Sequence, residues 1–368
     1  MKIKVLQENL KTALGNLQKA IPSRPQLPIL SSIYLKAEKN RLILAATDLY
    51  LGIKIAIPAE VSQEETLVVP GEILKNLVFS FSAGEIEIKK KANSLILKYG
   101  NSTSSLPFQS AEDYPQFPEV VGEDYSLSTL LLGKIEKLVA FAAATDQTRP
   151  ILASLLFSFK EKNLNLVGTD GFRLATLGTK DGSKDLTQDL LIPVKALTEV
   201  FRLATQAEEG SISFKVAEEL KQVLFIIDGA EVYVRLIEGE YPPYSKIIPP
   251  EFEYKINLDW DELNTQVKRA FLFSRDASNI IRFEVSKNKL EVKASSPAHG
   301  EYLGEINIAY SGEPLEIAFN ALYLLDFLAT HQAEEVIFMM NESLKPAAFK
   351  IQEEKDYLYL IMPFRTTD

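Results

Sequence analysis

The sequence predicts an α+β fold in which three similar domains follow one another, each with two helices packed on antiparallel sheets. The first observation is a repeated marker, a predicted strand that ends in Thr-Asp, which covers residues 42–49 and again residues 164–171, with a weaker third copy at 290–297. The second is a common order of helices and strands around each copy. The repeat is as long as a domain, whereas solenoid repeats run roughly 20–50 residues.

In the first third, Leu10, Leu14 and Leu17 recur at helical spacing and predict a helix over residues 9–20. Alternating apolar residues on either side of short polar turns predict strands. The expected strands cover residues 33–36, 41–46, 53–58, 85–89 and 94–98, and a second helix covers 71–81.

The other two thirds repeat this order. The expected helices cover residues 129–144, 194–205, 260–274 and 320–330, and the expected strands cover 154–160, 164–168, 211–216, 222–227, 281–285, 289–294, 336–340, 347–351 and 357–362. Short hairpin turns join the strands, which favours antiparallel sheets over the long crossovers that parallel strands require.

Two segments rich in acidic residues, Tyr and Pro separate the thirds, at residues 111–118 and 239–244. Because Pro restricts itself and the preceding residue to extended conformations, we expect ordered, stiff connectors. Together with the repeat, these connectors predict three domains at residues 1–120, 126–242 and 243–368.

The chain has 368 residues and no cysteine, which excludes disulfides and thiolate chemistry and fits a reducing compartment. Its first residues alternate like a strand and lack the apolar core of a signal peptide, and no segment approaches the roughly 20 apolar residues of a membrane span. We therefore expect a cytoplasmic protein. The net charge of −10 argues against a nucleic-acid binder, unless one face is basic.

No pattern of catalytic or metal-binding residues is recognisable, so the sequence predicts no enzyme, no metal and no cofactor. The two histidines, His299 and His331, lack metal-ligand spacing, and there is no glycine-rich phosphate loop. We interpret both histidines as ordinary surface residues and the Glu-Glu pairs as solvated charge.

Basic residues occur on or just after the predicted helices. Residues three or four apart share a helix face, so several of these cations would line one surface that binds phosphate weakly and non-specifically. The alternative is the ordinary polar face of an amphipathic helix. The residues concerned are Arg24, Lys75, Lys134, Lys137, Arg149, Arg202, Lys268 and Arg269.

A set of apolar residues and prolines forms a second candidate site. It comprises Leu152, Leu174, Leu177, Pro242, Ile247 and the C-terminal residues 359–365. These residues either complete a core or form a groove for a partner peptide, since Met and aromatic side chains suit adaptable binding surfaces.

The chain resembles the bacterial DNA polymerase III β subunit family of replicative sliding clamps. The resemblance covers the whole chain and rests on motifs that occur in the family's order. They are Arg24-Pro25-Gln26-Leu27-Pro28-Ile29-Leu30, Thr47-Asp48-Leu49, Glu112-Asp113-Tyr114-Pro115, Thr169-Asp170-Gly171-Phe172-Arg173-Leu174, Glu238-Gly239-Glu240-Tyr241-Pro242-Pro243-Tyr244, Tyr310-Ser311-Gly312, Phe319-Asn320 and Met362-Pro363-Phe364-Arg365.

The resemblance implies domains of the DNA-clamp type that form half of a closed ring, a head-to-tail homodimer through which duplex DNA passes. It places Leu272 and Phe273 at the subunit interface. It also implies a groove for short linear peptides of the replicative polymerase catalytic subunit, the clamp loader and repair or translesion polymerases. The implied groove residues are Leu152, Thr169, Gly171, Phe172, Arg173, Leu174, Leu177, Pro242, Lys246, Ile247, Pro346, Leu360, Met362, Pro363, Phe364 and Arg365.

The sequence departs from the family at Phe172, where many relatives have His, and at Lys246, where many have Arg. Two other hypotheses remain: a scaffold that binds peptides but not DNA, and an enzyme. An enzyme would require a cluster of titratable groups in one pocket, and a scaffold would not form a ring on circular DNA.

Overall fold

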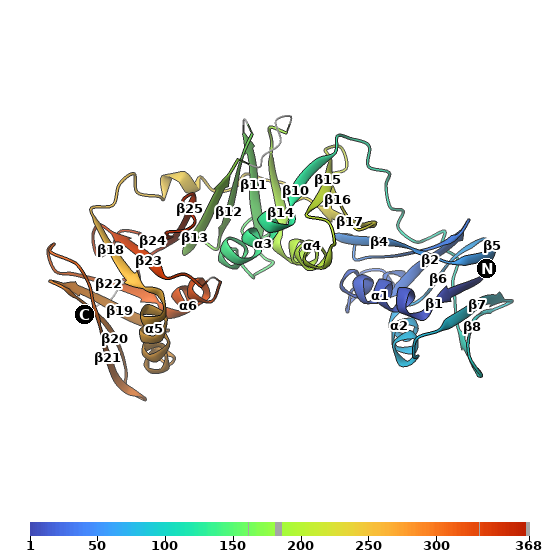
Figure 1. Ribbon diagram of the computed structural model, residues 1–368, viewed down its shortest axis with the longest axis horizontal. Coiled ribbons are helices and arrows are strands. Elements are labelled where there is room, and N and C mark those ends of the chain that lie inside the picture. The colour runs from blue at the N-terminus through green and yellow to red at the C-terminus, as the bar shows by residue number, and fades with distance from the viewer. Residues whose placement is uncertain (161, 181–185, 331, 366–368) are drawn as a thin grey trace. The chain divides into compact units, whose positions relative to one another are not determined.

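The computed structural model describes residues 1–160, 162–180, 186–330 and 332–365, which form six α-helices and 25 β-strands (Figure 1). His331 lies outside the described residues. Every strand pairing among the described residues is antiparallel, as the sequence predicts. No helix of the described part of the chain is long and apolar enough to cross a membrane.

The chain folds into two compact units: unit 1 is residues 1–130 with 195–236, and unit 2 is residues 131–194 with 237–368. Unit 1 holds two sheets. The strands of its eight-stranded sheet are, in spatial order, β10 (Tyr125–Ser128), β15 (Ser211–Ala217), β16 (Gln222–Ile227), β17 (Ala230–Arg235), β4 (Leu51–Pro58), β3 (Arg41–Thr47), β2 (Ser32–Glu38) and β6 (Glu65–Pro70). Those of its five-stranded sheet are β5 (Glu60–Gln63), β1 (Lys2–Leu6), β7 (Glu85–Lys91), β8 (Ser94–Tyr99) and β9 (Ser102–Leu106).

The helices of unit 1 are α1 (Gln7–Leu17), α2 (Gly71–Ser80) and α4 (Val194–Gln206), whose first residue belongs to unit 2. The leucines that predicted α1 are buried, and α1 packs on α2 and on β4. The Gln7 side chain donates to the carbonyls of Val78 and Phe81, both at 2.9 Å. It thereby satisfies the carbonyl of Phe81, just after α2, and shares that of Val78 with the Phe81 N–H.

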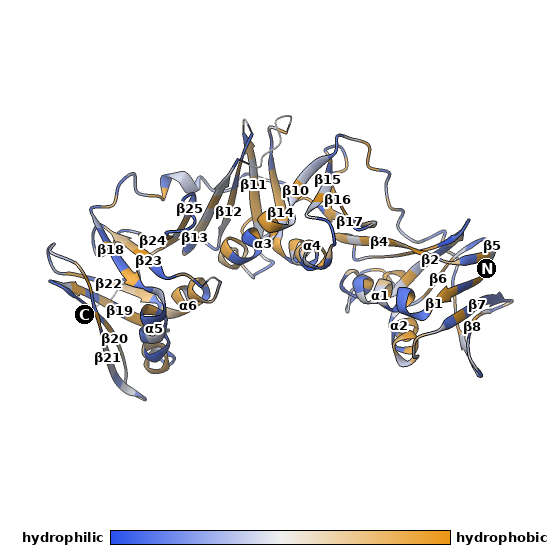
Figure 2. Cartoon of the chain, viewed as in Figure 1, coloured by the Kyte–Doolittle hydropathy of each residue, from blue (hydrophilic) through white to orange (hydrophobic). Residues whose placement is uncertain are grey.

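Unit 2 also holds two sheets. The strands of its eight-stranded sheet are, in spatial order, β14 (Asp189–Pro193), β11 (Ser154–Lys160), β12 (Asn163–Thr169), β13 (Arg173–Thr179), β25 (Tyr357–Ile361), β24 (Ala347–Ile351), β23 (Glu335–Met340) and β18 (Tyr254–Asp259). Those of its four-stranded sheet are β21 (Gly300–Asn307), β20 (Lys289–Ser296), β19 (Ile280–Ser286) and β22 (Leu315–Asn320). Figure 2 shows hydrophobic residues along the strands of these sheets.

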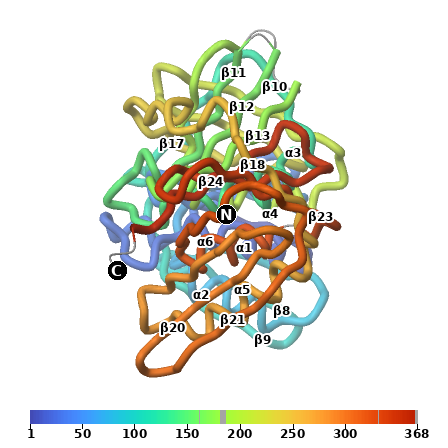
Figure 3. The backbone as a smooth tube through the Cα atoms, turned by 90° about the vertical axis from the view of Figure 1, so that its left-hand side faces the viewer, coloured from blue at the N-terminus to red at the C-terminus, as the bar shows by residue number. Residues whose placement is uncertain are grey.

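The remaining helices are α3 (Thr129–Leu138), α5 (Trp260–Ser274) and α6 (Ala321–Thr330). The bounds of α5 equal the predicted ones because Asp259 caps it, accepting a hydrogen bond from Glu262 N at 2.7 Å. In unit 2, α5 packs on α6 and on the hairpin of β20 and β21 (Figure 3). Trp260 lies 5.2 Å from Phe327 of α6, ring centre to ring centre, in an aromatic core.

Several details differ from the sequence prediction. The helix expected at 129–144 ends at Leu138, because the chain turns to let Ala144 N donate to the carbonyl of Leu152 at 2.8 Å. The expected strands did not include β13, nor β5, β6, β9, β10, β14, β17, β18, β21 and β22. The third marker acts through Ser296 and not Ser295, since the Ser296 hydroxyl accepts from Ala298 N at 3.2 Å while Ser295 is exposed.

Sheets run across the boundaries between the thirds of the sequence. Strand β4 pairs with β17 in unit 1, which we call the first junction, and β13 pairs with β25 in unit 2, which we call the second junction. The middle third therefore contributes strands to both units. The domain limits 1–120, 126–242 and 243–368 stay predictions.

Candidate functional site

The second marker forms a tight turn that presents Phe172 to solvent. The Thr169 hydroxyl donates to the carbonyl of Arg173 (2.5 Å), and the Asp170 carboxylate accepts from the backbone N–H groups of Phe172 (2.9 Å) and Arg173 (3.0 Å). Gly171 has a φ of +95°, a conformation that L side chains rarely adopt. With its backbone fixed in this way, Phe172 remains 57% exposed.

The chain beyond β25 joins this turn. Met362 N donates to the carbonyl of Phe172 at 2.8 Å, and the Met362 side chain is 38% exposed. Pro346 directly precedes Ala347, which pairs with Ile361 of β25. The structure therefore brings Phe172, Pro346 and Met362 to the same end of the neighbouring strands β13, β24 and β25, followed by Pro363.

The floor beside these strand ends is apolar. Leu174 and Leu360 pair across the second junction and belong to one buried cluster with Leu156, Val167 and Leu191. Thr169 pairs with Leu174 and shares its side of the sheet. Ile151 packs against the cluster, and its neighbour Leu152 is half-buried.

The second connector lies over this cluster, as an ordered segment. Tyr241 and Tyr244 pack against it, and the Tyr241 hydroxyl donates to the carbonyl of Val167 at 3.4 Å. Burial raises the pKa of Tyr241, although a backbone hydrogen bond at Thr169 lowers it in part. Pro242 accepts from Tyr244 N through its carbonyl (2.6 Å), and exposed Lys246 and Ile247 follow.

We use the name groove for the predicted peptide-binding residues that lie on this turn, floor and connector; that they bind a peptide stays a prediction. They are Leu152, Thr169, Gly171, Phe172, Leu174, Pro242, Lys246, Ile247, Pro346, Leu360, Met362 and Pro363. Four other expected members lie elsewhere: Leu177, Phe364, Arg365 and Arg173. Leu177 pairs with buried Tyr357, which stacks on Phe327 of α6, so Leu177 points to the helix side of the sheet. Residues three apart on a strand face opposite ways, so Leu174 and Leu177 do not share a surface.

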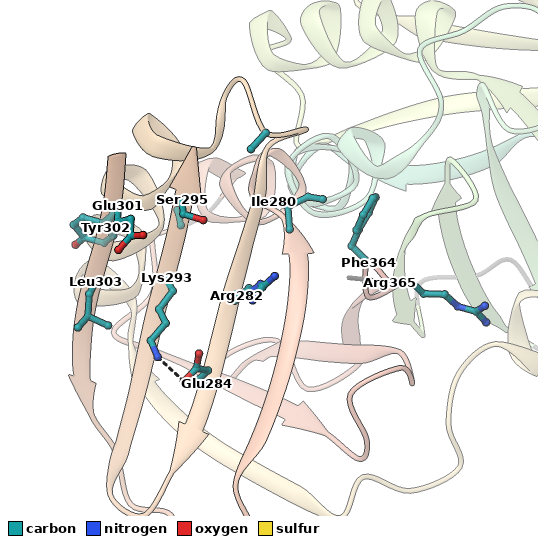
Figure 4. A pocket seen from close by; sticks show the side chains of 12 residues that line it. Ile280, Arg282, Glu284, Lys293, Ser295, Glu301, Tyr302, Leu303, Phe364 and Arg365 are labelled. Carbon is teal, nitrogen blue, oxygen red and sulfur yellow. Dashed lines mark hydrogen bonds and ion pairs between the residues drawn. The ribbon is translucent and has the colours of Figure 1, made fainter. Parts of the chain in front are cut away.

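The chain end also leaves the groove floor. Phe364 N donates to the carbonyl of Ala318 in β22 at 2.7 Å. Phe364 and Arg365 line a separate cavity of about 660 Å³ on the four-stranded sheet, together with Ile280 and Arg282 (Figure 4).

Arg173 is likewise buried on the helix side, at 8% exposure. Its guanidinium donates to Asp170 at 3.0 Å and to Asp326 of α6 at 2.6 Å. Burial lowers the pKa of Arg173, but Tyr359 and the two carboxylates outweigh it and raise that pKa overall. Sequence reasoning missed Asp326 and Tyr323, because single polar residues on an apolar helix carry no pattern.

The eight basic residues that were predicted to line one phosphate-binding surface, which in a clamp would face the DNA, fall into two groups. Three already have acceptors: Lys134 pairs with Glu354 (2.6 Å), Arg149 donates to the carbonyl of Asp170 (3.1 Å), and Arg202 donates to Glu199 (2.9 Å). The others are exposed, except that Lys75 is half-buried; they are Arg24, Lys137, Lys268 and Arg269.

The predicted interface residues lie on α5 next to a sheet edge. Leu272 is 54% exposed. Phe273 is half-buried and stacks on Tyr302 of β21, with ring centres 5.7 Å apart. Strand β21 is the edge of its sheet, so its outer backbone groups have no partner strand among the residues that the structure describes.

No group of three or more potential metal ligands occurs within the part of the chain that the structure describes. His299 lies at the surface with its Nε2 2.7 Å from a carboxylate oxygen of Asp276. This position agrees with an ordinary surface histidine.

The fold and the markers define a three-domain clamp, in which helices pack on antiparallel sheets that continue from one domain to the next. Three models of the DNA polymerase III beta subunit match the chain in order: the N-terminal domain at residues 1–118, the central domain at 127–243 and the C-terminal domain at 245–365. The chain belongs to the DNA polymerase III beta subunit family.

Individual relatives agree over the full length. The chain is 28% identical to the beta sliding clamp of Staphylococcus epidermidis and 26% identical to that of Chlamydia muridarum, with 100% of each chain covered. It is also similar to the crystal structure of a DNA polymerase sliding clamp from Bacillus subtilis, at 25% identity and a TM-score of 0.94 over 100% of both chains. Sliding clamps are non-catalytic processivity factors, so family membership confirms the prediction that this chain is not an enzyme.

Proposed function

We propose that this protein is a DNA sliding clamp: two copies join head to tail in a ring around duplex DNA, and the groove tethers the replicative polymerase. The observation that carries the proposal is the match to all three clamp domains over nearly the whole chain. A scaffold that binds peptides but not DNA would not require this three-domain arrangement.

Two bare sheet edges support a head-to-tail dimer. Strand β21 ends the four-stranded sheet beside exposed Leu272, and β9 ends the five-stranded sheet in the unit whose helix α2 exposes Ile73. Unpaired edge strands present rows of N–H and C=O groups that another strand satisfies. We propose that β21 and α5 of one copy meet β9 and α2 of the other.

The charges suit DNA that passes through without being read. Exposed Arg24, Lys137, Lys268 and Arg269 offer weak phosphate contacts. Such contacts carry no sequence information and weaken with salt, which permits sliding. The net charge of −10 keeps the remaining surface unfavourable to DNA.

For the groove we propose short linear peptides as ligands, from the polymerase catalytic subunit, the clamp loader and repair or translesion polymerases. Exposed apolar Phe172, Met362 and Ile247 beside a buried leucine floor suit apolar peptide side chains. A clamp acts where the chromosome is replicated, so we also propose a cytoplasmic location.

Retention on DNA tests the ring. Labelled protein is loaded on nicked circular DNA by the clamp loader and separated from free protein by gel filtration. We expect it to stay on the circle and to leave after a restriction enzyme linearises the DNA, because a topological link needs no affinity. Equal retention on linear DNA would overturn the proposal.

The variant Leu272→Asp tests whether retention depends on the dimer. A carboxylate at this exposed apolar site would be desolvated in a dimer, so we expect monomers by sedimentation and no retention on circles. Peptide binding to the groove should persist in the monomer. An unchanged dimer would contradict the assignment of Leu272 to the interface.

A further inference from the structure

We propose that Arg173 is a positioning residue of the groove: it holds Tyr323 of α6 beside Phe172 and does not itself contact the bound peptide. The inference rests on the proposed peptide binding and deepens it. It concerns how unit 2 keeps two aromatic rings at the rim of the groove.

The guanidinium joins two elements that are far apart in the sequence. Asp170 belongs to the turn before β13, and Asp326 belongs to α6, yet both carboxylates accept hydrogen bonds from Arg173, at 3.0 and 2.6 Å. Charge-assisted bonds of this kind are the strong ones. Arg173 therefore fastens α6 to the turn that presents Phe172.

The same guanidinium fixes an aromatic ring. It lies 4.8 Å from the ring centre of Tyr323 and 5.6 Å from that of Phe141. A cation over an aromatic face is attracted by the ring, and more strongly where water is excluded. The hydroxyl of Tyr359 also donates to the backbone carbonyl of Tyr323 at 2.8 Å, so both backbone and ring are held.

Tyr323 in turn supports the exposed rim. Its ring stacks on Phe172 with centres 6.5 Å apart and planes 20° from parallel. Phe172 is exposed, whereas Arg173 is 8% exposed and engaged by two carboxylates. A bound peptide would therefore contact the aromatic rings, while the buried arginine would hold those rings in position without contacting the peptide.

The first junction shows that the turn itself does not need an arginine. There the same turn has Leu51 in the place of Arg173, and its N–H donates to the Asp48 carboxylate at 2.7 Å. Leu51 is buried, and among the described residues the turn is tied to a helix only by the longer ion pair, 4.0 Å, between Asp48 and exposed Lys195 of α4. The arginine at the second junction adds the link to α6 and Tyr323, which the first junction lacks.

The test measures binding of a fluorescein-labelled peptide from the catalytic subunit of the replicative polymerase, by fluorescence anisotropy with the full-length dimer. Arg173→Leu copies the first junction. We expect it to weaken binding about tenfold, within the coupling range of contacting side chains, and Tyr323→Ala to do the same. The double variant should bind no more weakly than the worse single variant, because both act through one ring.

A second variant keeps the test valid if Arg173→Leu unfolds. Asp326→Asn removes the distant anchor, whose side chain is 47% exposed, and should weaken binding in the same direction without adding to Tyr323→Ala. Glu354→Gln is the matched control, since it breaks the 2.6 Å ion pair with Lys134 in the same unit and should leave binding unchanged. Emission from the single tryptophan, Trp260, which packs on α6, reports whether the core is intact.

The outcomes separate the two proposals. If the unaltered protein does not bind the peptide, the proposed groove function fails. If it binds and Asp326→Asn binds equally well, or if the losses from Arg173 and Tyr323 are additive, the positioning role is overturned. Non-additive losses with unchanged Trp260 emission support it, because a general loss of structure would alter that emission.

Discussion

At the first junction Arg235 N donates to the carbonyl of Tyr50 at 2.9 Å, and at the second Met362 N donates to the carbonyl of Phe172 at 2.8 Å. The two marker turns also share their side-chain bonds to the backbone. Thr47 and Thr169 each donate to the carbonyl four residues on. The repeat in the sequence is therefore a repeat of backbone geometry, and the side chains account for the difference between the junctions.

The connectors repeat as well. Tyr114 is buried and Tyr241 is partly buried, and the hydroxyl of each donates to a backbone carbonyl at 3.4 Å. Burial raises the pKa of each phenol, and a backbone bond at the marker threonine lowers it in part. Each connector thus enters its junction in the same way.

What differs is the surface beside the turn. At the first junction exposed Tyr50 has the Arg235 guanidinium 5.9 Å from its ring centre, an amphipathic pair. At the second junction the same two positions are Phe172 and Met362, both apolar and exposed. The same backbone arrangement therefore carries a partly polar surface in unit 1 and an apolar surface in unit 2.

The floor differs in the same sense. Gly52 pairs with Tyr233 at the first junction, where Leu174 pairs with Leu360 at the second. The ring of Phe117, from the first connector, lies over Gly52 and packs edge-on against Tyr233 at 5.2 Å. The chain thus covers its first junction with its own side chain.

Removing the exposed apolar pair should separate the junctions most clearly. We expect Phe172→Ala with Met362→Ala to weaken peptide binding by about 100-fold or more, because burying each side chain is worth roughly 1.5–3 kcal/mol and 1.4 kcal/mol is tenfold. Tyr50→Ala with Arg235→Ala, the same change at the first junction, should have almost no effect. Equal losses in the two double variants, measured by anisotropy, would refute the comparison.

A larger side chain at Gly52 of the first junction should destabilise the protein. A side chain at Gly52 would place its Cβ 2.8 Å from Phe117, so Gly52→Leu must displace that ring. We expect a loss of roughly 1–3 kcal/mol in the free energy of unfolding, as for other overpacked cores, measured by urea unfolding. Gly210→Leu, where no atom lies within 4 Å of the added Cβ, is the control and should cost less.

The two marker turns should respond in opposite directions to exchanges involving glycine, with smaller changes in the free energy of unfolding. Gly171 has a φ of +95°, while Leu49, its counterpart, has a φ of +76°. We expect Gly171→Ala to lower the free energy of unfolding by about 1 kcal/mol and Leu49→Gly to raise it, since only glycine adopts this conformation without strain. Urea midpoints that move in the same direction for both variants would contradict this reading of the turns.

Copying the apolar pair onto the first junction should have the smallest effect. Tyr50→Phe with Arg235→Met reproduces the exposed side chains of the second junction. We expect calorimetry to detect a weak second peptide site per chain. Its affinity should stay low because Gly52 occupies the position that Leu174 has in the groove. If no additional binding occurs even at millimolar peptide, the leucine floor and not the exposed pair determines the site.

Much of the fold follows from the sequence, because helices such as α5 have both a regular apolar spacing and a capping residue. Strand β13 escaped prediction because Thr176, Gly178 and Thr179 interrupt its apolar pattern. The leucine floor of the groove was predictable from Leu174 and Leu360. Tyr323 and Asp326 were not, since their role depends on which helix packs behind the turn, and this is decided by long-range packing.

The pairing of strands across each junction has a mechanical consequence. Five residue pairs join β4 to β17, and five join β13 to β25. A force that pulls two neighbouring domains apart would have to break all the backbone hydrogen bonds of such a strand pair at once. In the proposed ring, we expect the contact between the bare edges β21 and β9 to separate without unfolding either copy, so we expect the gate for DNA at that seam and not at these two junctions.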